Sequence, residues 1–142
     1  MCGIAGVLGH PDANMLHRMN RLQDHRGPDE NDVWLDEHVG FAHARLSILD
    51  LQSSQQPMSS SEGDVLVLNG EIYNHLELRS QRPNYPFKTV GDTEAILATH
   101  QAAKQRQNTA LTAKEHASWL ASLDGMYALA LWNPEAKELI LA

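Results

Sequence analysis

Strand-like apolar segments stand at both ends of this chain, and helical patterns lie between them. Apolar runs bounded by turn residues predict strands, whereas apolar positions three and four residues apart predict helices. The expected strands cover residues 4–8, 33–35, 39–42, 65–68, 126–132 and 138–141, and the expected helices cover residues 14–22, 75–82, 92–105 and 112–123. Strands at both ends with helices between them predict an α+β sandwich of layers.

Local signals refine this outline. Asp12 or Asn14 can cap the first helix, and Thr112 with Glu115 has the spacing of a capping box. The dipeptide Asn69-Gly70 is a preferred two-residue turn, so we expect residues 65–68 and 71–73 to form a hairpin. The Ser- and Gln-rich stretch 52–63 has the composition of a loop.

Length and charge limit the class of protein. A chain of 142 residues has the size of one domain, and its net charge of −7 argues against nucleic acid or an anionic membrane as a partner. The sequence shows no secretory signal and no apolar run long enough to span a bilayer. A single cysteine fits a reducing compartment. We therefore expect a cytoplasmic domain.

That single cysteine, Cys2, directly precedes the first expected strand. Removal of Met1 would place a thiol and a free α-amine on one residue. An α-amine titrates near ~7.7–8, close to the pH at which a general base works well. N-terminal nucleophiles activated by their own amine carry out acyl transfer. The alternative is a small buried hydrophobic residue, and Cys2 alone does not decide between them.

Five other positions offer the remaining parts of an amide-cleaving site. The side-chain amide of Asn69 and the backbone N–H of Gly70 suit an oxyanion hole, although the same dipeptide is also a good turn. Arg45 could hold a carboxylate with two hydrogen bonds, or could be a surface arginine. Asp92 could bind an ammonium group or cap the helix that it begins, and Glu71 is a weaker candidate for the same ammonium.

A series of strings then resembles one family in order and wording: Met1-Cys-Gly-Ile4, His25-Arg-Gly-Pro-Asp29, His43-Ala-Arg-Leu-Ser-Ile48, Gln56-Pro57, Asn69-Gly-Glu-Ile-Tyr-Asn-His75, Gly91-Asp-Thr-Glu94 and Asp124-Gly-Met-Tyr-Ala128. They are similar to the glutaminase domain of glutamine-hydrolysing asparagine synthetase. That domain is a class II glutamine amidotransferase of the N-terminal-nucleophile hydrolase type. The resemblance implies a four-layer αββα sandwich and one glutaminase domain over residues 1–142.

The resemblance also implies a role for each residue. Cys2 would be the nucleophile and its α-amine the base, while Asn69 and Gly70 would form the oxyanion hole. Arg45 would bind the α-carboxylate of glutamine, and Glu71 and Asp92 its α-amine. Backbone groups around Ile48 would help to seat the substrate. The implied reaction is hydrolysis of glutamine to glutamate and ammonia, which supplies asparagine synthesis. The string 25–29 would support the first strand.

Two alternatives remain: a non-catalytic module that binds glutamine, and an amidotransferase half that serves another acceptor. We expect no cofactor at these residues, because the ATP and magnesium of the family would belong to a synthetase domain. No histidine pair has a recognised metal spacing, so no metal is expected.

Two departures from the family pattern give further expectations. The segment Lys104 to Trp119 is longer and more polar than usual, and we interpret it as a surface insertion. The family continues with further strands after a position like Ala142, so we expect the sandwich to be incomplete there. An open sheet edge would favour a synthetase partner or a homodimer.

Overall fold

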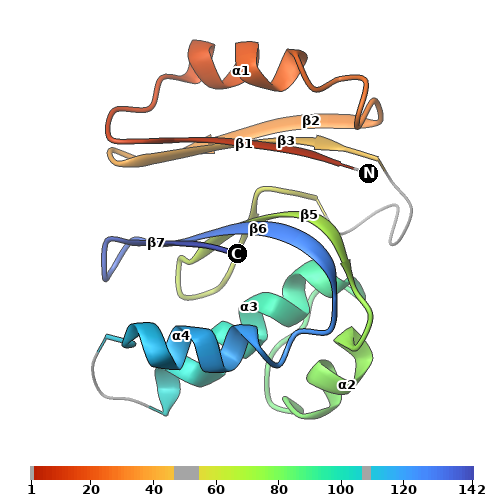
Figure 1. Cartoon of the computed structure of the whole chain (residues 1–142), viewed down its shortest axis with the longest axis vertical. Coiled ribbons are helices and arrows are strands. Elements are labelled where there is room, and N and C mark those ends of the chain that lie inside the picture. The colour runs from red at the N-terminus through yellow and green to blue at the C-terminus, as the bar shows by residue number, and fades with distance from the viewer. Residues whose placement is uncertain (1, 47–54, 107–109) are drawn as a thin grey trace.

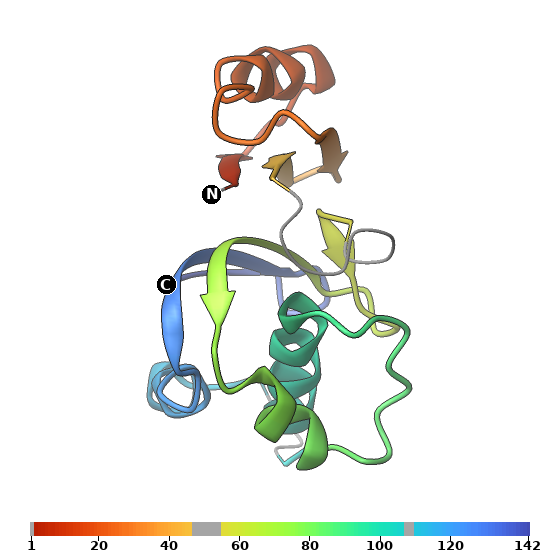
Figure 2. The same ribbon diagram turned by 90° about the vertical axis from the view of Figure 1, so that its right-hand side faces the viewer.

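The chain folds into four layers, which the computed structural model describes for residues 2–46, 55–106 and 110–142. Helix α1 (Ala13–Arg21) covers the outer face of a sheet with strand order β1-β3-β2. A second sheet, of order β4-β5-β6-β7, packs against the first and carries α2, α3 and α4 on its outer face (Figures 1 and 2). The remaining bounds are β1 Gly3–Leu8, β2 Glu30–Leu35, β3 Val39–Arg45, β4 Met58–Ser59, β5 Val65–Ile72, α2 His75–Ser80, α3 Asp92–Gln105, α4 Ala113–Leu120, β6 Gly125–Asn133 and β7 Glu138–Leu141. The predicted αββα sandwich is confirmed.

Two apolar cores hold the layers together. Between the sheets, Val39 and Phe41 of β3 pack with Val67 of β5 and Trp132 of β6. Between the second sheet and its helices lies a larger core, to which α3 contributes Ala95, Ile96 and Leu97. Side chains of alternate strand residues face opposite sides of a sheet. Because Val65 and Val67 of β5 face the first sheet, Asn69 and Glu71 belong to that same inner face.

Local signals placed most helix ends correctly. Asp12 caps α1 by accepting a hydrogen bond from the Met15 N–H at 2.9 Å. Thr112 and Glu115 form the predicted capping box at the start of α4. Helix α3 begins at Asp92, but its N-cap is Gly91 and no capping side chain is present. The interpretation of Asp92 as an N-cap is therefore wrong.

The predicted hairpin at Asn69-Gly70 is also wrong, because β5 continues straight through this dipeptide. Gly70 pairs with Tyr127, and the ladder with β6 continues to Ile72 and Gly125. Gly70 has φ +145°, and a Cβ atom there would lie 2.1 Å from the Met126 carbonyl oxygen and 2.5 Å from the Tyr127 Cα. The glycine thus serves the close approach of two strands rather than a turn.

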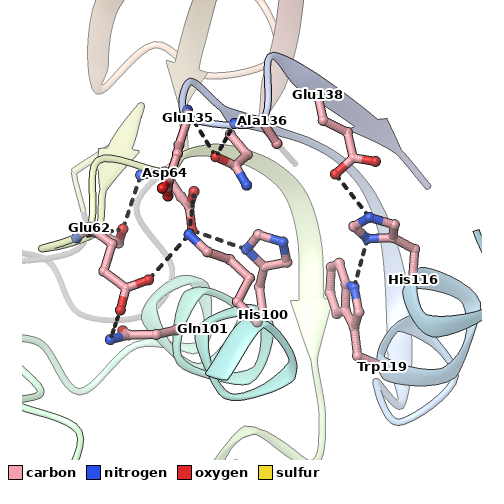
Figure 3. Close-up of polar contacts among 12 residues, drawn as sticks. Glu62, Asp64, His100, Gln101, His116, Trp119, Glu135, Ala136 and Glu138 are labelled. Atoms are coloured by element: carbon pink, nitrogen blue, oxygen red, sulfur yellow. Dashed lines mark hydrogen bonds and ion pairs between the residues drawn. The ribbon is translucent and has the colours of Figure 1, made fainter. Parts of the chain in front are cut away.

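The segment interpreted as a surface insertion is partly buried. His116 and Trp119 are 8% and 5% exposed, and the Trp119 Nε1–H donates to His116 Nδ1 at 3.1 Å. His116 Nε2 in turn lies 2.9 Å from a carboxylate oxygen of Glu138 (Figure 3). The surface interpretation holds for most described residues of this segment, which are exposed, and is wrong for Leu111, His116 and Trp119, which are buried. Positions 107–109 lie outside the described residues.

A second polar cluster ties α3 to β5 beside this segment (Figure 3). The fully buried Asp64 lies 3.1 Å from His100 Nδ1 and 3.2 Å from Lys104 Nζ. Burial alone would raise the pKa of Asp64, but the hydrogen bonds and charges of His100 and Lys104 lower it below the usual value. Asp64 is therefore ionised at neutral pH, and Lys104 supports the fold.

One further expectation changes in detail. The Ser- and Gln-rich stretch contains the short strand β4, which pairs with Val65 and Leu66 of β5; positions 52–54 lie outside the described residues. Among the described residues, no helix is long and apolar enough to cross a membrane.

Candidate active site

Strand register brings Cys2 beside Arg45 at one end of the first sheet. Gly3 of β1 pairs with Ala44 of β3, so one further step places Cys2 opposite Arg45. Cys2 is half-buried, and its Sγ lies 3.5 Å from the Leu46 N–H, which donates to it. Directly paired residues share a face of the sheet. Cys2 and Arg45 therefore lie on the face that carries Val39 and Phe41, toward the second sheet.

The string around Gly27 supports this end of β1, as the resemblance implied. Arg26 donates from Nε to the Cys2 carbonyl oxygen at 3.1 Å. The Asp29 N–H donates to the Arg45 carbonyl at 3.0 Å. A Cβ atom at Gly27 would lie 2.2 Å from the Ala44 carbonyl oxygen, so only glycine allows this approach to β3. The loop thereby holds the backbone on both sides of the candidate nucleophile.

Arg45 is buried at 4% exposure and has an acidic partner that the sequence did not reveal. Its Nη1 lies 2.9 Å from Glu30 Oε2, and Glu30 is its direct neighbour across β2 and β3. A guanidinium carries five N–H donors, so a carboxylate partner and a substrate carboxylate can share it. The surface interpretation of Arg45 is wrong.

Asn69, Gly70 and Glu71 lie at the end of β5 that approaches the N-terminus. Strands β1 and β5 contact one another between the sheets. Figures 1 and 2 both place the start of β1 beside the end of β5. Asn69 Oδ1 is buried without a hydrogen-bond partner among the described residues. Glu71 is exposed.

Asp92 links α3 to this end of β5. Its Oδ2 accepts a hydrogen bond from the Ile72 N–H at 2.9 Å, and the residue is 9% exposed. Asp92 of α3 is thus bonded to the end of β5 that carries Asn69 and Gly70, and β5 contacts the strands β1 and β3 that lead to Cys2 and Arg45. Ile48, the other predicted substrate contact, lies outside the described residues.

Sequence reasoning missed two polar residues at this site. His43, which had no assigned role, is 1% exposed, and its Nε2 lies 3.2 Å from the Leu68 carbonyl oxygen. Burial lowers the pKa of His43 to about 4. Gln56 accepts the Leu68 N–H at 2.6 Å and donates to Thr93 Oγ1 at 3.3 Å. Both residues stand in segments that resemble the family, but only the fold shows that both contact Leu68, the residue before Asn69.

The described part of the chain holds no group of three or more His, Cys, Asp or Glu side chains suited to a metal ion. The arrangement instead offers a thiol, a buried arginine, a buried carboxylate and an amide with a neighbouring backbone N–H. These are the parts of an acyl-transfer site for a small zwitterionic amide.

The four layers define the fold class of the chain, an αββα sandwich. A structure of glutamine phosphoribosylpyrophosphate amidotransferase from Bacillus subtilis matches the whole chain and 37% of its own length, with a TM-score of 0.65 and 19% identity. That likeness concerns the fold. The glutamine amidotransferase domain family matches residues 1–142, so the chain belongs to that family.

The chain is also similar in sequence to glutamine-hydrolysing asparagine synthetases. The chain is 41% identical over 143 residues to asparagine synthetase (glutamine-hydrolyzing) 1 of Bacillus subtilis, covering 94% of this chain and 21% of the relative. It is 37% identical to asparagine synthetase B (glutamine-hydrolyzing) of Escherichia coli, covering 95% of this chain and 24% of that protein. The chain therefore spans between a fifth and a quarter of the length of these relatives.

Proposed function

We propose that this domain hydrolyses glutamine to glutamate and ammonia through a thioester on Cys2, and that the ammonia supplies asparagine synthesis. The observation that supports the proposal is that strand register sets Cys2 opposite Arg45 on sheet strands that contact β5, while Asp92 bonds the end of β5 that carries Asn69 and Gly70. The relatives named as glutamine-hydrolysing asparagine synthetases support the choice of substrate and acceptor.

Substrate binding in this proposal uses both charged ends of glutamine. Arg45 binds the α-carboxylate, and Asp92 with Glu71 binds the α-ammonium group. Backbone groups near Ile48 complete the seat. Fixing both ends aligns the side-chain amide with Cys2 Sγ. It also reduces the entropy that is lost on reaching the transition state.

The chemistry follows from the N-terminal position that Cys2 takes once Met1 is removed. Sγ attacks the amide carbon while the α-amine, acting through a water molecule, accepts the thiol proton. The Asn69 side-chain amide and the Gly70 N–H donate to the developing oxyanion. The C–N bond breaks, the α-amine returns the proton, and ammonia leaves. Water then cleaves the thioester, which releases glutamate and restores the thiol.

Gly70 is well placed for this donation. In an antiparallel ladder, the N–H groups of alternate residues point to the same edge of a strand. The Leu68 and Ile72 N–H groups point to the outer edge of β5, where Gln56 and Asp92 accept them. The same alternation predicts that the Gly70 N–H points to that edge, between the other two.

We further propose that ATP and magnesium act at a synthetase domain or subunit rather than at residues 1–142. The relatives extend well beyond the matched segment, which supports such a partner. A homodimer through an open sheet edge stays a prediction. We assign the domain to the cytoplasm, because a reducing compartment preserves the single thiol.

A glutaminase assay combined with intact mass spectrometry tests the proposal. We expect glutamate and ammonia in equal amounts from protein that lacks Met1, and no turnover from Cys2→Ala. Molecules that retain Met1 are an internal control, because their α-amine is blocked, and should be inactive. Glutamine binding without turnover would favour the non-catalytic module. Unchanged turnover in Cys2→Ala would refute the proposed function.

A further inference from the structure

Among the residues that the structure describes, side chains rather than a strand hold the outer edge of β5 near the site. Strand β4 pairs with β5 only at Val65 and Leu66. Beyond that point the Leu68 N–H donates to Gln56 Oε1 at 2.6 Å, and its carbonyl lies 3.2 Å from His43 Nε2. Asp92 accepts the Ile72 N–H at 2.9 Å. Buried peptide groups need such partners, and these three replace the missing strand.

His43 is the member of this set that comes from the other sheet. It pairs directly with Ile4, two residues beyond Cys2, and it precedes Arg45 by two residues on the same face of β3. Its own carbonyl accepts from Asn20 Nδ2 of α1 at 3.1 Å. One buried hydrogen bond therefore joins the strands that carry Cys2 and Arg45 to the residue before Asn69.

The direction of this hydrogen bond follows from its chemistry. A carbonyl oxygen only accepts, so the Nε2 of His43 carries the hydrogen. Burial lowers the pKa of His43, and the Arg45 charge lowers it further, while the Leu68 bond and Glu30 act in the opposite direction; the net result is a neutral ring at neutral pH. One tautomer of His43 thus donates permanently to Leu68.

We propose that His43 is a positioning residue, which holds the Leu68–Asn69 peptide group so that Asn69 and Gly70 face the thioester-forming carbon above Cys2. This inference rests on the proposed glutaminase function. The Leu68 carbonyl and the Asn69 nitrogen belong to one planar peptide unit, so fixing the first fixes the backbone of the second. Gln56 holds the Leu68 N–H on the same edge of β5. A misplacement of about 1 Å at such a site can lower the rate about a hundredfold.

The test compares steady-state kinetics of His43→Leu, His43→Gln and Trp132→Phe with the wild type. Leucine removes the donor at similar size, whereas glutamine keeps an N–H donor at a reach near that of Nε2. Trp132→Phe is the matched control, because Trp132 Nε1 donates to Asp36 Oδ2 at 2.6 Å and so joins the same two sheets at the far end of β5. A merely structural role would make the His43 and Trp132 variants alike.

We expect kcat to fall about 10- to 100-fold in His43→Leu with KM for glutamine nearly unchanged, because an oxyanion donor acts mainly in the transition state. His43→Gln should recover most of this loss, and Trp132→Phe should keep kcat within about twofold of the wild type. If His43→Leu does not fold, His43→Asn replaces it: its shorter amide should give a kcat well below that of His43→Gln.

Two results would overturn the inference while the wild type is active. One is a kcat of His43→Leu, or of His43→Asn where it replaces that variant, that equals the kcat of His43→Gln. The other is a loss of kcat in Trp132→Phe as large as that in the His43 variant. A folded wild type without Cys2-dependent turnover would instead refute the proposed function, and the positioning role with it.

Discussion

Replacing Gly70 with alanine should destabilise the domain far more than the same change at another glycine of unusual backbone conformation. Gly70 has φ +145°, where L-residues are strained by about 1–3 kcal/mol. The added Cβ would also lie 2.1 Å from the Met126 carbonyl oxygen and 2.5 Å from the Tyr127 Cα. Both neighbours are backbone, so relief requires β5 and β6 to separate by about 1 Å, at a further cost of about 1–3 kcal/mol. We expect a total loss of about 2–6 kcal/mol.

Gly9→Ala is the matched control for this prediction. Gly9 has φ +114°, but a Cβ atom there meets nothing within 4 Å, so the variant carries the backbone strain alone. We expect it to lose about 1–3 kcal/mol. Urea unfolding followed by tryptophan fluorescence gives both free energies, with the m-value as a check on two-state behaviour.

The comparison bears directly on how β5 passes the candidate site. Equal losses in Gly70→Ala and Gly9→Ala would refute the argument that close approach to β6 requires glycine. The continuous strand through Asn69-Gly70 would then lack its physical reason, and a turn at this dipeptide would regain support.

Three further predictions concern pH, substrate binding and helix capping. The free energy of unfolding should fall by about 3 kcal/mol as pH is lowered from 6.5 to about 4, because the unfolded state binds a proton that buried His43 does not. Urea titrations at several pH values should show a smaller change of this free energy with pH in His43→Leu. An equal change in both proteins would contradict the prediction. Arg45→Lys should raise KM for glutamine about 10- to 100-fold with a smaller change in kcat, because lysine cannot form a bidentate pair with a carboxylate. An unchanged KM in steady-state assays would show that Arg45 does not bind the substrate. Thr112→Ala should lower the free energy of unfolding by about 1 kcal/mol in urea or thermal unfolding, because it removes the capping box. Turnover should stay unchanged, since α4 lies on the outer face of the second sheet. A stability equal to that of the wild type would show that the cap contributes nothing.

Patterns within one segment predicted the fold well. The helix over Asp92–Gln105, the strand over Glu138–Leu141 and the Thr112 capping box all match the structure. Each depends on periodicity or on side chains a few residues apart, which the chain sequence contains directly. The hairpin at Asn69-Gly70 failed because pairing with β6 overrides the preference of a dipeptide.

In the candidate site, too, the sequence indicated some residues, whereas contacts between distant segments appeared only in the structure. Residue chemistry and the family resemblance identified Cys2 and Arg45, which strand register then placed together. The partners of these residues were not predictable, because Glu30 meets Arg45 only through the register of β2 and β3. His43 likewise contacts Leu68 only because two sheets stack. Such contacts join segments far apart in sequence, and no local pattern encodes them.

The most direct test of the account is to trap the covalent intermediate. Protein lacking Met1 is mixed with glutamine, quenched in acid within the first turnovers and analysed by intact mass and peptide mapping. The account predicts a γ-glutamyl group on the peptide that begins with Cys2, and its disappearance once glutamine is exhausted. Glutamate formation with that group on another residue, or at the same rate in Cys2→Ala, would contradict the central claim.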